Sequence, residues 1–264
     1  MFNTPIREAL QQAHSFDSDL ARANSSYAAF ENNKLVRVLD PDQRPSALMG
    51  LVHDSFRALV LSPQFSCVGA KAAMNRGDYR MGMYSKMNTP GTNAGLARDL
   101  FAFVQEQPLI DSNFTTFIAS FAEPHPVDEV DFERLLWQQL QSLHDLDAPL
   151  HPWDPSVSSD PANPAFSFSF AGRAFFIVGL SPASSRWTRR FAWPTLVFNA
   201  HTQFEQLREC GKYKSMQATI RAREYALQGS FNALLSDFGE QSEARQYAGR
   251  SVEQGWQCQF HSHP

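Results

Sequence analysis

The stretch AFSFSFAGRAFFIVGL, residues 165–180, decides the fold of this chain. Its first half, 166–170, alternates phenylalanine with serine, which is the period of a strand with one apolar face. Its second half, 174–180, is continuously apolar, as a strand covered on both faces is. Between them, Ala171 to Arg173 turns the chain. The sequence therefore predicts a β-hairpin inside a covered sheet.

Segments on both sides of this hairpin extend the sheet and cover it. Residues 114–122 are rich in β-branched and aromatic side chains, and 195–199 form a short apolar run, so both are predicted strands. Predicted helices span residues 45–62, 94–107, 127–147 and 213–228, and another begins at His201. This order predicts an α+β fold: one domain over residues 1–264 with a central, mainly antiparallel sheet flanked by helices.

Composition and charge limit the possible functions. The 22 phenylalanines must fill a core or line an apolar pocket, which suits a planar hydrophobic ligand. A net charge of −4 gives no electrostatic case for nucleic acid or an anionic membrane. Three cysteines, at positions 67, 210 and 258, form no disulfide framework, which favours a cytoplasmic setting. Arg7 and Glu8 interrupt the N-terminus, and no stretch reaches the roughly 18 apolar residues of a spanning helix.

Cys67 is the first candidate for chemistry, because the GxSxG, GxxxxGK[ST], HExxH and GxGxxG motifs are absent. It precedes VGAKAAM, residues 68–74, and the start of a helix there would offer backbone N–H groups and Lys71 to a thiolate. A buried structural cysteine is an equal alternative. A nucleophile and an iron ligand both stay open, and only the ligand explains the aromatic content.

Two histidine-containing segments compete with Cys67. His201 stands at a predicted strand end and helix start, where functional side chains are often presented, and imidazole is a good iron ligand. For a lone histidine, a capping role is favoured over ligation. Near the C-terminus, CQFHSHP groups Cys258, His261 and His263 like a metal cluster. Terminal tails are usually poorly ordered, which argues against a zinc site there.

Arginines cluster after the hairpin, in SSRWTRRF. Arg186, Arg189 and Arg190 lie here, and Arg221 and Arg223 follow in IRARE. Such runs are usually solvated charges, yet guanidinium groups bind carboxylates in a bidentate manner and tryptophans are interleaved with these arginines. A ligand with an apolar body and carboxylate arms fits this mixture, and haem has that anatomy.

Five sequence blocks occur in order over most of the chain from about residue 50. They are FSCVGAKAAMNRGDYRMGMY, DPANPAFSFSFAGRAFFIVGLSPASSRWTRRF, LVFNAHTQFEQLR, TIRAREYALQGSFNALLSDFGEQSEARQYAGR and WQCQFH. Together they resemble the YqcI/YcgG family, in particular its branch of haem-dependent N-hydroxylases, which includes the guanitoxin-precursor and arginine N-hydroxylases. Two positions depart from the family pattern: Ser66 and Gln259 stand where the family often has proline.

The resemblance implies a cytoplasmic haem-dependent monooxygenase that hydroxylates a nitrogen of an amino-acid-derived guanidino or amino compound. Haem iron, dioxygen and an external electron donor, either a redox partner or a reductase, are then required. Cys67 is preferred to His201 as the iron ligand, because an axial thiolate promotes O–O cleavage. The candidate catalytic residues are Cys67 and His201. The expected haem-binding residues are Cys67, Lys71, Arg186, Arg189 and Arg190, with Arg221 or Arg223 less favoured.

The substrate cation would meet a carboxylate, and Asp78, Glu205 and Glu224 are equal candidates. Two other functional classes stay open. A non-catalytic haem-binding or sensor protein would share the same residues and would lack amine-dependent oxygen consumption. A cofactor-free thiol enzyme would use Cys67 as nucleophile and His201 as base, and would show no Soret band after haem addition.

Overall fold

A single sheet organises the part of the chain that the computed structural model describes, residues 14–112, 114–229 and 239–263. Its strands lie in the spatial order β2 (Lys34–Arg37), β1 (Ala28–Glu31), β3 (Tyr79–Lys86), β4 (Thr116–Glu123), β7 (Thr195–Ala200), β6 (Arg173–Leu180) and β5 (Phe168–Phe170). β3 and β4 are parallel, and the other neighbouring strands are antiparallel. The predicted α+β class with a mainly antiparallel sheet is confirmed.

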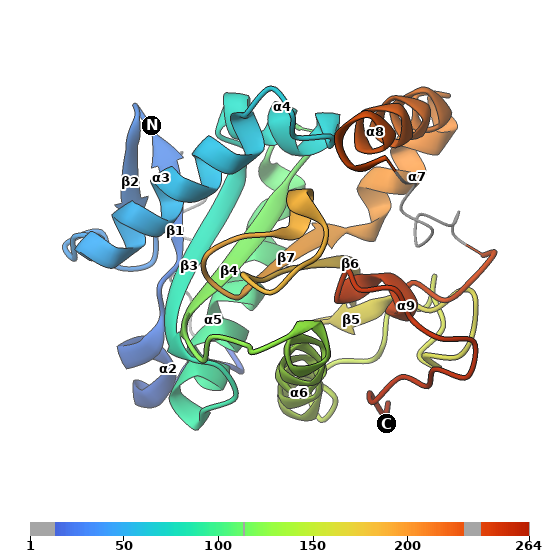
Figure 1. Cartoon of the computed structure of the whole chain (residues 1–264). Helices are drawn as coiled ribbons and strands as arrows, with labels where there is room; N and C mark the ends of the chain where they lie inside the picture. The colour runs from blue at the N-terminus through green and yellow to red at the C-terminus, as the bar shows by residue number, and fades with distance from the viewer. Residues whose placement is uncertain (1–13, 113, 230–238, 264) are drawn as a thin grey trace.

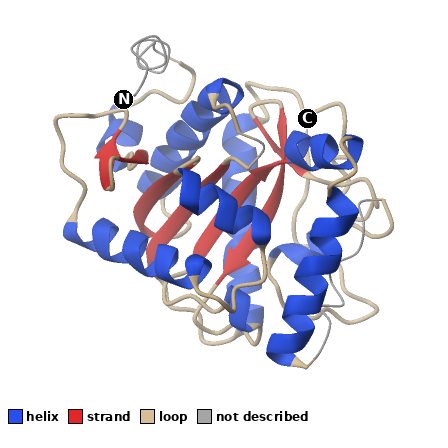
Figure 2. Ribbon diagram, turned by 90° about the horizontal axis from the view of Figure 1, so that it is seen from above, coloured by secondary structure: helices blue, strands red, loops and turns tan. Residues whose placement is uncertain are grey.

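Helices cover both faces of this sheet (Figure 2). They are α2 (Asp19–Asn24), α3 (Ala47–Leu61), α4 (Val68–Arg76), α5 (Pro90–Glu106), α6 (Glu129–Asp147), α7 (His201–Glu209), α8 (Tyr213–Gln228) and α9 (Ala244–Tyr247), with 3₁₀ turns η1 (Gln107–Leu109) and η2 (Trp187–Arg189). The helices predicted from apolar periodicity are α3, α5, α6 and α8. α5 begins four residues before its predicted start, because Thr89 caps it and Pro90 occupies its first position.

The predicted hairpin forms β5 and β6. Ala171 and Gly172 both have positive φ, 50° and 69°, so they make a two-residue turn, and Arg173 belongs to β6 instead of the turn. β5 begins at Phe168, two residues later than predicted. Phe166 instead makes a single bridge to the preceding loop. The hairpin is therefore correct in place and shorter in its first arm.

Two apolar cores lie on opposite faces of the sheet. Successive strand residues point to opposite faces, so Phe117 of β4 packs in the core under α5 and α6, whereas Ile118 packs in the core under α3 and α4. The same alternation separates Val197 and Phe198 of β7. Both faces are thus buried, which explains the continuous apolar runs in the central strands.

The sequence did not predict β1, β2 or β3. β3 carries Arg80 and Gly82 inside a buried strand, so it lacks both strand alternation and a continuous apolar run. Arg80 is tolerated there because its guanidinium pairs with Glu106 of α5, and both side chains are buried. The residue that compensates the Arg80 charge belongs to a helix distant in sequence, so the residues around Arg80 carry no pattern that predicts a strand.

Two predictions concern the N-terminus and membrane-spanning helices. Arg7 and Glu8 lie outside the described residues. Within the described ranges, no helix combines the length and the apolar content needed to cross a bilayer. The assignment of residues 1–264 to one domain stays a prediction.

Candidate functional site

Cys67 lies where the chain enters α4. Its backbone is extended, its side chain occupies the N-cap position, and its Sγ accepts a hydrogen bond from the Ala70 N–H at 3.4 Å. Phe65 and Ser66 just before it are buried, whereas Cys67 itself is half-buried. The predicted short helix after the cysteine is confirmed. Cys67 is thus held with its sulfur against the exposed N–H groups of a helix start.

Opposing influences act on the Cys67 thiol. Burial raises its pKa, and Glu224 adds to that rise. The N–H groups of Ala70 and Gly69 and the positive charge of Arg189 lower the pKa in part. The net direction is upward, so the free thiol keeps its proton at neutral pH. A metal ion bound to the sulfur would remove that proton, because coordinated thiols ionise.

Glu224 reaches the Cys67 region from α8. Figure 1 shows α8 beside α4 at one edge of the molecule, and the two helices are in contact. The Glu224 side chain is buried, and its Oε1 accepts hydrogen bonds from the hydroxyls of Ser66, at 3.2 Å, and Thr188, at 3.4 Å. Its Oε2 is also buried and accepts no hydrogen bond from any residue that the structure describes. One half of this carboxylate is therefore unsatisfied.

Arg189 brings a positive charge to the same place from η2. Its guanidinium donates hydrogen bonds to the backbone carbonyls of Gly179, at 3.0 Å, and Tyr247, at 3.3 Å. Burial lowers its pKa to about 10, so it stays charged at neutral pH. Neither Glu224 oxygen accepts a hydrogen bond from it. A half-buried cation and a buried anion thus flank Cys67 without pairing directly.

The other predicted cofactor-binding side chains lie differently. Lys71 donates to the carbonyls of Ser62, at 2.7 Å, and Pro63, at 3.3 Å, so it braces the loop before Cys67. Arg190 is exposed, and its Nε donates to a neighbouring backbone carbonyl at 2.9 Å. Arg186 and Arg221 are half-buried, and Arg223 is exposed. Among these arginines, Arg189 is the one whose charge acts on the Cys67 thiol.

His201 is the first residue of α7, as the sequence predicts, and it is almost fully buried. The N-cap is Ala200, so His201 does not cap the helix through its side chain. Its Nδ1 lies 3.9 Å from Glu243 Oε1, and its Nε2 lies 3.7 Å from Glu205 Oε1. Burial lowers the pKa of His201, which favours the neutral imidazole.

Glu243 beside His201 was not predicted. Its Oε2 lies 2.9 Å from the Ser167 hydroxyl and 3.4 Å from the Tyr247 hydroxyl. Burial raises the pKa of Glu243 to about 8, so it is mostly protonated at neutral pH. Ser167 is the sequence signal that could have indicated Glu243. It is a polar residue in a buried hairpin arm, and a buried hydroxyl needs a hydrogen-bond partner.

The family comparison covers nearly all of these residues. The model of the YqcI/YcgG family matches residues 56–261, which begin in α3 and include α4, η2, α7, α8 and α9. The chain belongs to the YqcI/YcgG family. It is 32% identical over 95 residues to "Uncharacterized protein YqcI" of Bacillus subtilis (strain 168), over 35% of this chain and 37% of that protein. The alignment thus spans little more than a third of that relative. No solved structure matches the chain.

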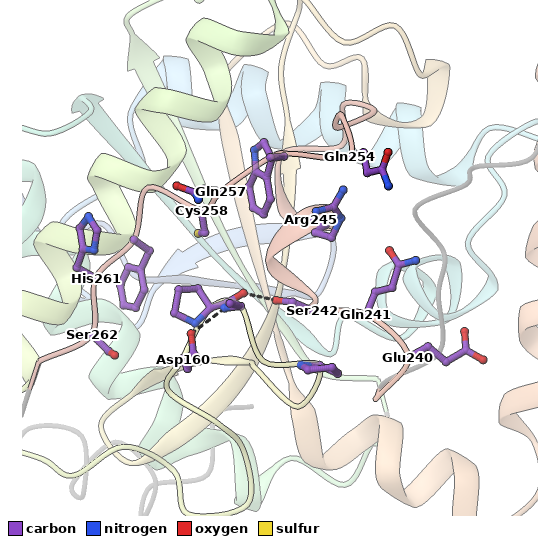
Figure 3. Close-up of a pocket in the computed structure, with 15 residues that line it drawn as sticks. Asp160, Glu240, Gln241, Ser242, Arg245, Gln254, Gln257, Cys258, His261 and Ser262 are labelled. Carbon is purple, nitrogen blue, oxygen red and sulfur yellow. Dashed lines mark hydrogen bonds between the residues drawn. The ribbon is translucent and has the colours of Figure 1, made fainter.

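The C-terminal part of this YqcI/YcgG family member lines an open pocket of about 830 Å³ (Figure 3). Cys258 and His261 lie on its wall with Arg245, facing the loop at Asp160. His263 is turned away, because its Nε2 lies 2.9 Å from Asp145 Oδ1. In the described ranges, no three histidine, cysteine, aspartate or glutamate side chains are placed to hold a metal ion together. Burial raises the pKa of Cys258 to about 12, so its thiol stays neutral.

Proposed function

We propose that this family member is a haem-dependent N-hydroxylase, of the branch that oxidises a nitrogen of a guanidino or amino compound. It would work in the cytoplasm with dioxygen and an external electron donor. The observation that carries the proposal is the position of Cys67. Its sulfur stands at the start of α4 next to an N–H donor, and the charges of a half-buried arginine and a buried glutamate act on it.

The residues around Cys67 fit a haem. Cys67 offers a sulfur ligand, and the apolar cluster that it borders includes Phe65 and Trp187. At Gly69 a Cβ atom would lie 3.1 Å from a ring carbon of Phe114, so this aromatic ring packs closely against the backbone at the start of α4. Arg189 supplies the charge that a propionate requires. Cys67 and Arg189 are the residues that would hold the haem.

A thiolate-ligated haem, when bound, supplies oxygen activation with external electrons. The chain's own residues do the rest. The Cys67 thiol would lose its proton on ligation, and the Ala70 N–H would stabilise the negative sulfur. Arg189 would orient a carboxylate while keeping its bonds to the Gly179 and Tyr247 carbonyls.

Absorption spectra of the haem-loaded protein test the ligand. The reduced, carbon monoxide-treated protein should show a difference band at about 450 nm, as thiolate-ligated haem proteins do. Cys67→Ala should abolish this band, and His201→Ala should retain it. A parent protein without the band, whose haem is released by His201→Ala alone, would transfer the ligand role to His201. No Soret band in any variant would reject the proposal.

Neighbouring arginines provide a matched test of the propionate contact. Arg189→Met removes the half-buried guanidinium near Cys67, whereas Arg190→Met removes an exposed one in the same loop. Haem titration should show affinity about tenfold weaker or more for Arg189→Met, because charge pairing matters when it is shielded from water. The Arg190→Met control should bind haem like the parent. Equal affinities for the two variants would contradict the role of Arg189.

The cofactor-free thiol enzyme gains no support from the geometry. A nucleophilic cysteine needs a depressed pKa, whereas burial raises that of Cys67. We therefore retain the haem proposal alone.

A further inference from the structure

The buried carboxylate of Glu224 is incompletely satisfied. Only 8% of the residue is exposed, yet its Oε2 has no hydrogen-bond partner among the described residues. Buried polar groups in native proteins are nearly always paired, and an unpaired buried carboxylate is among the costliest exceptions. An exception beside a candidate catalytic residue calls for a partner beyond the residues that the structure describes, such as a bound ligand.

The other candidate carboxylates already have partners or lie in water. Asp78 pairs with Arg76 at 2.6 Å, and the Glu205 side chain is 46% exposed. Glu243 accepts hydrogen bonds on its Oε2 from two hydroxyls and is mostly protonated at neutral pH. Glu224 alone among these four combines burial, proximity to Cys67 and an unsatisfied oxygen.

We propose that Glu224 is the anionic anchor for a small cation that carries N–H donors, an ammonium or guanidinium group, beside Cys67. Its Oε2 accepts the hydrogen bond from the ligand, while its Oε1 stays fixed by Ser66 and Thr188. This inference rests on the proposed function, because it identifies the bound cation with the nitrogen compound that is oxidised.

The chemistry around Glu224 selects this ligand class. A metal ion needs several donor side chains, and the structure places no such group among its described residues. A neutral ligand could fill the missing hydrogen bond but would add no positive charge beside Glu224, which forms no direct ion pair with Arg189. An N–H cation supplies both the charge and the missing hydrogen bond. Arg189 makes no hydrogen bond to Glu224, and its Nη1 and Nη2 groups donate to the backbone carbonyls of Gly179, Tyr247 and Gln246.

Two probes of nearly equal shape test the anchor. L-Arginine carries a guanidinium group, and L-citrulline has a neutral urea in its place; both share the α-ammonium group, so the pair isolates the guanidinium. Calorimetric titration of the purified full chain, as isolated and after haem addition, should show L-arginine binding about tenfold or more tighter than L-citrulline. Glu224→Gln should remove this preference. Glu209→Gln, which removes an exposed carboxylate from α7, should keep it.

The outcomes separate this inference from the haem proposal. A Glu224→Gln protein that still prefers L-arginine would overturn the anchor, and so would a parent protein that binds both probes with dissociation constants above about 10 mM. Haem binding by Glu224→Gln is measured separately from its Soret band, so a loss of haem is distinguished from a loss of the probe preference. A parent protein that binds no haem but still prefers L-arginine to L-citrulline would reject the haem proposal and support Glu224 as the anchor.

Discussion

Two pairs of charged residues in this protein, one closed and one open, are built in opposite ways. In the first, between β3, α5 and β1, Arg80 and Glu106 form a direct ion pair, and the Tyr27 hydroxyl donates to Glu106 Oε2 at 2.6 Å. In the second, at the start of α4, Arg189 and Glu224 stay apart and Glu224 Oε2 is unsatisfied. We call the first pair closed, because its charged groups satisfy each other, which serves stability. We call the second pair open, because one buried oxygen has no partner among the described residues and can accept a hydrogen bond from a ligand.

Breaking the closed pair should give the largest effect on stability. Arg80→Met leaves Glu106 charged and buried without its guanidinium partner. The free energy of unfolding should fall by about 3 to 5 kcal/mol, as measured by urea denaturation. A loss below about 1 kcal/mol would mean that the pair is not a structural element, and the contrast between the two groups would fail.

Glu243 offers an intermediate case, in which a proton neutralises the buried charge. Its pKa rises from 4.5 to about 8 on folding, so the folded chain binds more protons than the unfolded chain between these values. The free energy of unfolding should therefore fall as pH rises through this window, by several kcal/mol at about 1.4 kcal/mol per pH unit. Glu243→Gln should flatten that dependence in urea denaturation from pH 5 to 8. A variant with an unchanged pH dependence would contradict the raised pKa.

Neutralising Glu224 should change the free energy of unfolding in the opposite direction to breaking the Arg80–Glu106 pair. Glu224→Gln keeps an acceptor for Ser66 and Thr188 but removes a buried charge whose Oε2 has no hydrogen-bond partner among the described residues. Without ligand, the free energy of unfolding should rise by about 1 kcal/mol in urea denaturation. A fall of about 1 kcal/mol or more would show that Glu224 is a structural residue, like Glu106.

An exposed charge near the site should matter least. Arg190→Gln removes a guanidinium that lies in solvent, so the free energy of unfolding should change by no more than about 0.5 kcal/mol. Thermal denaturation of this variant beside Arg189→Gln sharpens the comparison, because the two arginines are adjacent in sequence and differ in burial. A large loss of thermal stability for Arg190→Gln would mean that the difference in burial between Arg189 and Arg190 does not determine their effects on stability.

The sequence by itself determined the elements whose signals are local. The hairpin at 166–180, the strand at 114–122 and the helix after Cys67 follow from periodicity and turn residues over a few positions. The position of His201 at a strand–helix boundary follows from the same signals. Family membership rests on ordered blocks of residues, which are also a property of the sequence alone.

Only the tertiary structure decided which charged residues meet. Arg186, Arg189 and Arg190 are equivalent in sequence, yet the fold brings Arg189 to Cys67 and leaves Arg190 in solvent. Glu224 lies 157 positions after Cys67, counted from their residue numbers, and the contact of α8 with α4 joins them. Burial and hydrogen-bond satisfaction are sums over neighbours distant in sequence, so no local pattern encodes them.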